Sequence, residues 1–108
     1  MRLSILRAGG LAGRTSRTEV SSDSLTPEDA KELHEKVVES GVLTMPPEPP
    51  PTTAHPDEFE YELTVEHDTG SHTVLRPQSA LSPELRSLIQ WADGRPESER
   101  SNVPPGGA

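Results

Sequence analysis

A stretch of strictly alternating apolar and polar side chains constrains the fold of this chain most strongly. Four apolar residues take every second position, and mostly acidic residues take the positions between them: Phe59, Tyr61, Leu63 and Val65 against Glu58, Glu60, Glu62, Thr64 and Glu66. Because successive side chains of a strand point to opposite faces of a sheet, this alternation predicts a strand over residues 58–66. One face of the strand is buried and the other is solvated, as in an antiparallel sheet that is covered on one side.

Three further segments favour strands. Residues 1–7 place apolar side chains at alternate positions, and residues 14–21 contain the β-forming threonine and valine. Residues 71–76 return after a turn at 67–70, so they predict a partner for the alternating strand. The pattern therefore predicts two hairpins, of which the first has an unusually long tip.

Two segments carry helix-start signals, in which a capping hydroxyl precedes proline and acidic residues. Thr26 and Ser82 are the expected N-caps, and Gly41 and Gly94 are the expected stops. An apolar stripe follows each cap at helical spacing, namely Ala30, Leu33, Val37 and Val38 in the first and Leu85, Leu88, Ile89 and Ala92 in the second. The chain order is thus β-β-α-β-β-α. We expect a two-layer α+β fold, with a four-stranded antiparallel sheet and both helices on one face.

The rest of the chain carries little core. Residues 46–56 are proline-rich and predict a stiff, extended linker inside a single domain of residues 1–94. Residues 95–108 are polar and contain proline and glycine, so we expect a disordered tail.

Composition excludes several classes of function. The 108 residues contain no cysteine, which rules out disulfides, thiolate catalysis and thiolate zinc sites. A formal net charge of −8 disfavours nucleic acid as a partner. No apolar run approaches the ~18 residues that span a membrane, and the short apolar start does not resemble an export signal. We therefore expect a cytoplasmic protein with no nucleic-acid or membrane partner. We also expect a monomer.

Candidate catalytic and metal motifs are incomplete. His34 begins a zinc-protease H-E-x-x-H pattern, but Val38 stands where the second histidine is needed. Asp68–Ser71 has the letters of the aspartic protease signature, yet Asp-x-Gly between two strands is ordinary turn composition. His67 and His72 flank that turn, where a weak metal contact is the alternative to two exposed histidines. We expect no enzymatic activity, no cofactor and no metal.

The connection between the first two predicted strands is the strongest candidate for function. Its sequence is apolar and rich in glycine, whereas hairpin loops that serve stability alone have two to five polar residues. Such a tip has no evident folding benefit, and its uncluttered backbone can enter a narrow groove. We predict a partner-binding surface formed by Arg7, Ala8, Gly9, Gly10, Leu11, Ala12, Gly13 and Arg14.

The same loop, placed after an opening strand, resembles the start of the emfourin family, the protealysin inhibitors. The resemblance is strongest in residues 59–66 with His72-Thr73-Val74, and it covers residues 1–93. Ala8 stands where we expect serine in that family. The proline-rich segment 46–56 is not expected in that family and looks like an insertion particular to this chain.

The resemblance implies a bacterial inhibitor of thermolysin-like (M4) zinc metalloproteases. The slim tip would enter or cover the protease cleft, and Leu11 would fill an apolar side-chain pocket. Inhibition would then come either from blocked access or from a group that reaches the zinc ion. A different class of function is an adaptor that holds a protein partner through the acidic strand face, with Glu58, Glu60 and Glu62, or through the proline-rich segment.

Overall fold

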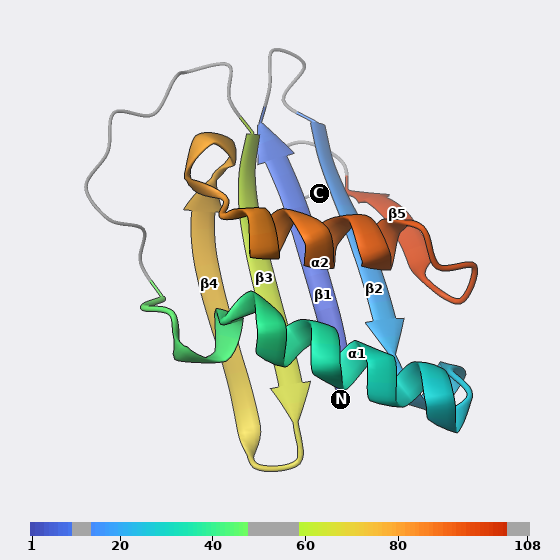
Figure 1. Ribbon diagram of the computed structural model, residues 1–108. Coiled ribbons are helices and arrows are strands. Elements are labelled where there is room, and N and C mark those ends of the chain that lie inside the picture. Colours follow the sequence, from blue (N-terminus) through green and yellow to red (C-terminus); the bar gives the residue numbers. More distant parts are fainter. Residues whose placement is uncertain (10–13, 48–58, 104–108) are drawn as a thin grey trace.

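In the computed structural model, which describes residues 1–9, 14–47 and 59–103, two helices cross one face of a five-stranded antiparallel sheet (Figure 1). The strands are β1 (Arg2–Gly9), β2 (Arg14–Ser21), β3 (Phe59–His67), β4 (Gly70–Pro77) and β5 (Glu99–Val103). Their spatial order is β4-β3-β1-β2-β5, so β1 is the central strand. The α+β class and the two layers are confirmed, and the six predicted elements occur in the predicted order, but a fifth strand follows them.

The predicted number of four strands is wrong, because residues 99–103 form β5. We expected this segment to be disordered, but it pairs with β2 from Thr15↔Val103 to Glu19↔Glu99. The side chains of β5 at positions 99–101 are exposed, so this described part of the strand shows no apolar alternation that would reveal it in the sequence. β5 is held to β2 through backbone hydrogen bonds, which any residue except proline can donate and accept whatever its side chain. Residues 104–108 lie outside the described part of the chain.

The two helices begin where the capping signals predict. They are α1 (Pro27–Ser40) and α2 (Pro83–Asp93), with short 3-10 turns at Ser22–Ser24, Val42–Thr44 and Gln78–Ala80. Thr26 Oγ1 accepts a hydrogen bond from the Asp29 amide at 3.2 Å, and Ser82 Oγ accepts one from the Leu85 amide at 3.2 Å. Among the described residues, no helix is long and apolar enough to cross a membrane.

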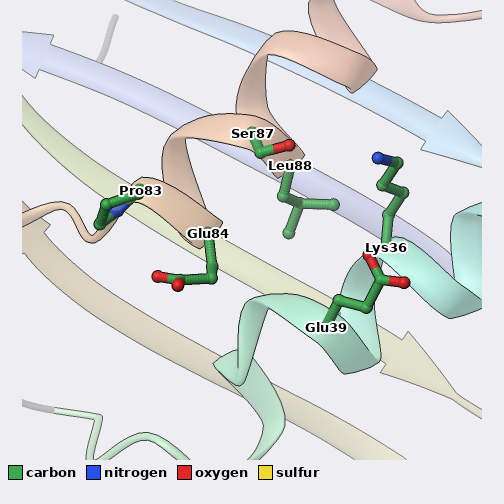
Figure 2. A pocket seen from close by; sticks show the side chains of 6 residues that line it. All are labelled: Lys36, Glu39, Pro83, Glu84, Ser87 and Leu88. Carbon is green, nitrogen blue, oxygen red and sulfur yellow. The ribbon is translucent and has the colours of Figure 1, made fainter.

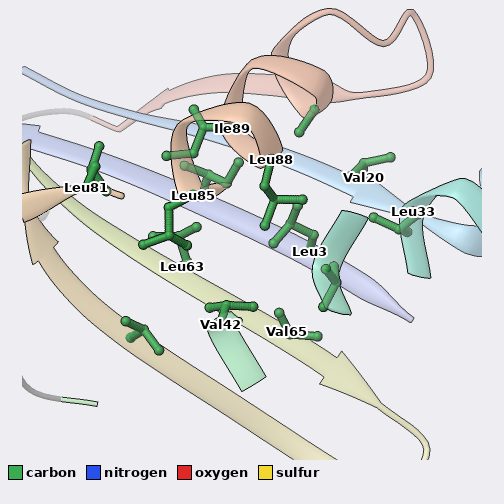
Figure 3. Packing of buried hydrophobic residues seen from close by; sticks show 14 residues of the cluster. Leu3, Val20, Leu33, Val42, Leu63, Val65, Leu81, Leu85, Leu88 and Ile89 are labelled. Carbon is green, nitrogen blue, oxygen red and sulfur yellow. The ribbon is translucent and has the colours of Figure 1, made fainter. Parts of the chain in front are cut away.

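A single apolar core lies between the sheet and the helices (Figure 3). Its buried members are Leu3, Ile5, Val20, Leu63, Val65 and Val74 from the sheet, and Leu33, Val37, Val42, Leu81, Leu85, Leu88, Ile89 and Ala92 from the helix layer. Val38 was predicted in the apolar stripe of α1 but is 54% exposed. It lies one position, or about 100° of helix rotation, beyond Val37, so it points away from the sheet.

The start of the predicted 46–56 linker is fastened to β4. The Leu75 amide donates to the Pro47 carbonyl at 2.9 Å, and Arg76 Nη2 donates to the Pro46 carbonyl at 2.8 Å. Arg76 is only 7% exposed, so the two carbonyls help to satisfy a buried guanidinium. Residues 48–56 of the predicted linker lie outside the described residues.

Candidate functional site

The arms of the first hairpin form the middle of the sheet. β1 and β2 pair over eight positions, from Arg2↔Ser21 to Gly9↔Arg14, and β1 also pairs with β3 up to Gly9↔Phe59. The predicted site residues Arg7, Ala8 and Gly9 are therefore the last three of the central strand, and Arg14 is the first of β2. The predicted tip residues Gly10, Leu11, Ala12 and Gly13 lie outside the described residues.

Gly9 ends β1 in a conformation that requires glycine. Its φ angle is 109°, a region that residues with a side chain rarely adopt. The backbone at the end of β1 thus has a conformation that would be strained for any residue with a Cβ atom. Gly9 was predicted to contribute to binding because it has no side chain, and its positive φ angle is a second, backbone reason for glycine at this position.

Arg7 lies on the helix-covered face of the sheet. Its Nη2 donates to Asp93 Oδ2 at 2.5 Å, and its guanidinium carbon lies 5.4 Å from the centre of the Tyr61 ring. Its Nε is buried and has no hydrogen-bond partner among the described residues. These contacts give Arg7 an anchoring role within the chain, whereas contact with a partner stays a prediction.

Asp93, the last residue of α2, holds both arms of the hairpin. Besides accepting from Arg7, it accepts a hydrogen bond from Thr18 Oγ1 of β2 at 3.0 Å. Asp93 is not among the site residues predicted from the sequence. The sequence contained one signal for its role. A carboxylate in the last turn of a helix lies at the negative end of the macrodipole, where it is unfavourable unless a cationic or hydrogen-bonding partner compensates it.

A hollow of about 390 Å³ opens beside the hairpin arms on the helix side of the sheet. Its lining mixes apolar and charged side chains, including Phe59, Tyr61, Ile89, Arg7, Arg86 and Asp93. Phe59 is 37% exposed although the alternation predicted a buried face, because its neighbour across the pair is Gly9, which offers no side chain to cover it. Arg86 is exposed and forms no ion pair among the described residues.

A second hollow, of about 220 Å³, lies between the two helices (Figure 2). Lys36 and Glu39 of α1 face Glu84 and Ser87 of α2 across it, and Leu88 lies at its base. No described residue of the hairpin arms lines this hollow. The hollow is therefore separate from Arg7, Ala8 and Gly9 of the candidate binding surface.

The motifs that were weighed as catalytic or metal-binding take ordinary structural places. His34 is exposed on α1, and Asp68 with Thr69 forms the turn between β3 and β4. His67 Nδ1 hydrogen-bonds with Thr69 Oγ1 at 2.9 Å, while His72 Nε2 donates to the Met45 carbonyl at 2.9 Å. Within residues 1–9, 14–47 and 59–103, no group of three or more His, Asp or Glu is placed to hold a metal ion.

The acidic face of β3 is partly neutralised. Glu60, Glu62 and Glu66 lie on the face of the sheet opposite the helices, and Glu58 lies outside the described residues. On that face, Arg2 Nε lies 3.2 Å from Glu19 Oε1, and Arg2 Nη1 lies 3.6 Å from Glu66 Oε2. The mixed charges give no specific support to an adaptor that binds through an acidic surface.

Comparison with known protein families gives a match over most of the chain. A family model described as Emfourin matches residues 5–93, a range that begins within β1, includes β2, both helices, β3 and β4, and ends before β5. No curated protein and no solved structure matches the chain.

Proposed function

The chain belongs to the emfourin family of protease inhibitors, and we propose that it inhibits a thermolysin-like (M4) zinc metalloprotease by blocking the active-site cleft with the hairpin between β1 and β2. In this proposal the chain acts by binding and performs no catalysis of its own. The contact surface consists of Arg7, Ala8, Gly9, Gly10, Leu11, Ala12, Gly13 and Arg14.

The observation that carries this proposal is the way the hairpin arms are held. The arms pair with each other over eight positions, and β1 is flanked by β3 on its other side. Asp93 adds a hydrogen bond to each arm from the helix layer. A tip carried on arms that are already ordered loses less conformational entropy on binding, which favours tight association.

The composition of the tip suits an enzyme cleft. Glycine at positions 9, 10 and 13 removes side chains that would hold the backbone away from cleft walls. Leu11 is the one large apolar side chain between Arg7 and Arg14, and it supplies a group for an apolar specificity pocket. The arginines at both ends of the loop remain close to the cleft rim in this arrangement.

Titration of a thermolysin-like enzyme with the purified chain tests the proposal. We expect peptidase activity to fall with increasing inhibitor, and we expect Leu11→Arg and Gly10→Trp to raise the inhibition constant at least about tenfold, or 1.4 kcal/mol. Val38→Arg is the matched control, because it places the same arginine on the exposed side of α1. Folded Leu11→Arg and Gly10→Trp variants that inhibit as well as the parent chain would contradict the proposal.

A further inference from the structure

β5 covers an edge that the matched family region leaves open. The family match ends at residue 93, whereas β5 spans Glu99–Val103 and pairs with the outer edge of β2. Without β5, β2 would be an edge strand with unpaired N–H and C=O groups, which form a template for another strand. β5 therefore keeps other strands away from this edge of β2.

β5 has the properties of a removable cover. Its side chains at positions 99–101, the ones that the structure describes, are exposed and do not belong to the apolar core. Glu99 lies directly opposite Glu19, and like charges in a cross-strand pair weaken the pairing. The strand therefore relies on backbone hydrogen bonds, and its loss removes no buried side chain among the described residues.

The turn before β5 directs the chain onto β2. Arg95 Nη2 donates to Asp29 Oδ2 of α1 at 2.6 Å, and Arg95 Nε donates to Glu97 Oε1 at 3.1 Å. Ser98 Oγ donates to the Ala92 carbonyl at 2.6 Å. These contacts fix where β5 starts, so the strand begins next to the outer edge of β2 (Figure 1).

The edge beneath β5 is complementary to itself. If two copies of β2 pair antiparallel about a two-fold axis at Thr18, Arg17 of each copy lies opposite Glu19 of the other. Both side chains lie on the face of the sheet opposite the helices, because Thr18, between them, is buried against the helix layer. Opposite charges in cross-strand pairs stabilise a sheet, and the two-fold symmetry forms the favourable pair twice.

We propose that the outer edge of β2 is a pairing surface for a second copy of this chain, and that β5 closes it. The parent chain is then a monomer, and detachment of β5 allows two sheets to join through β2. The proposal is independent of protease inhibition, which uses the loop at the end of the hairpin. The occupant is a second copy because its charges match this edge, whereas Glu99 of the resident strand repels Glu19.

The test detaches β5 in the full chain with the double variant Arg100→Pro and Ser101→Pro. Consecutive N–H groups of a strand point to opposite edges, so one of the two prolines must remove a donor that faces β2. The control is Arg100→Ala with Ser101→Ala, which keeps both donors. Light scattering after size exclusion should give the 11.7 kDa monomer for the parent and the control. It should give twice that mass for the proline variant.

A charge reversal tests whether the β2 edge makes the contact. Arg17→Glu in the proline background places glutamate opposite Glu19 of the second copy, and we expect the dimer to return to monomer. Adding Glu19→Arg restores opposite charges and should restore the dimer. A folded proline variant that stays monomeric, a dimer that ignores Arg17→Glu, or a dimeric parent chain overturns the proposal. Loss of the far-ultraviolet circular dichroism of the fold in the proline variant also overturns it, because β5 would then be part of the structural core.

Discussion

Arg7 on the central strand is bound to Asp93 at the end of α2, 86 positions later in the chain. The same carboxylate accepts a hydrogen bond from Thr18 on the neighbouring strand. One side chain therefore links the helix layer to both arms of the hairpin that we propose as the inhibitory element. The packing of α2 on the sheet and the conformational ordering of the two hairpin arms are consequently coupled.

Asp93→Ala is expected to weaken both stability and inhibition. The substitution leaves Arg7 and Thr18 without their acceptor in a partly buried setting, which costs about 1–3 kcal/mol. Urea unfolding measures the loss of stability, and titration of a thermolysin-like enzyme measures inhibition of the folded fraction. Glu35→Ala on the exposed side of α1 is the control, with an expected change within about 0.5 kcal/mol. An Asp93→Ala protein as stable as that control would show that the hydrogen bonds do not anchor the arms.

Local signals in the sequence were sufficient to predict most of the fold. Thr26 and Ser82 cap the helices that they predict, because a capping hydroxyl needs only the amide three residues ahead. The alternation in 59–65 predicted the face of β3, with Leu63 and Val65 fully buried. In each case the interacting residues lie within a few positions of one another, so the sequence alone is enough to predict the structure that they form.

Long-range pairing could not be predicted in the same way. β5 buries none of its described side chains, so its position depends on the open edge of β2 and on the turn that Arg95 fixes. The link from Asp93 to Arg7 likewise depends on how α2 lies across the sheet. For the candidate site, the sequence indicated the loop and its glycines. The hollow lined by Arg7 and Phe59 became visible only when η3 (Gln78–Ala80), α2 and β3 were brought together.

Leu88→Ala should be strongly destabilising because Leu88 is 1% exposed at the contact between α2 and the sheet (Figure 3). Loss of its side chain leaves a cavity, and we expect a decrease of about 3 kcal/mol in the free energy of unfolding. Leu75→Ala makes the same change at a residue that is 44% exposed on β4, and it should cost less than about 1 kcal/mol. Thermal or urea unfolding of the two variants provides the comparison. Equal effects would mean that the core does not lie where the structure places it.

Gly9→Val is expected to disturb the end of the central strand. A β-branched residue at φ 109° is strained, and we expect a cost of about 1–3 kcal/mol in the free energy of unfolding. Ala8→Val is the control for stability, since Ala8 lies in regular strand and valine favours that conformation. The same urea titration measures both variants. If Gly9→Val were as stable as Ala8→Val, the positive φ would not be a requirement of the hairpin.

The hollow beside the hairpin leads to a prediction about the extent of the contact surface. Phe59 and Arg86 line this hollow, both are exposed, and neither belongs to the buried core. An inhibitor tip that enters a cleft brings its flanks against the cleft rim, and exposed aromatic and arginine side chains at such places often dominate binding energy.

Phe59→Ala and Arg86→Glu should therefore raise the inhibition constant by about tenfold each, or about 1.4 kcal/mol, with the free energy of unfolding nearly unchanged. Glu62→Lys is the control, because Glu62 lies on β3 but faces away from the helices and the hollow. Inhibition titrations with urea unfolding of the same samples separate binding from stability. If Leu11→Arg weakens inhibition while Phe59→Ala and Arg86→Glu do not, the contact is confined to the loop, because the hollow then lies outside the buried interface.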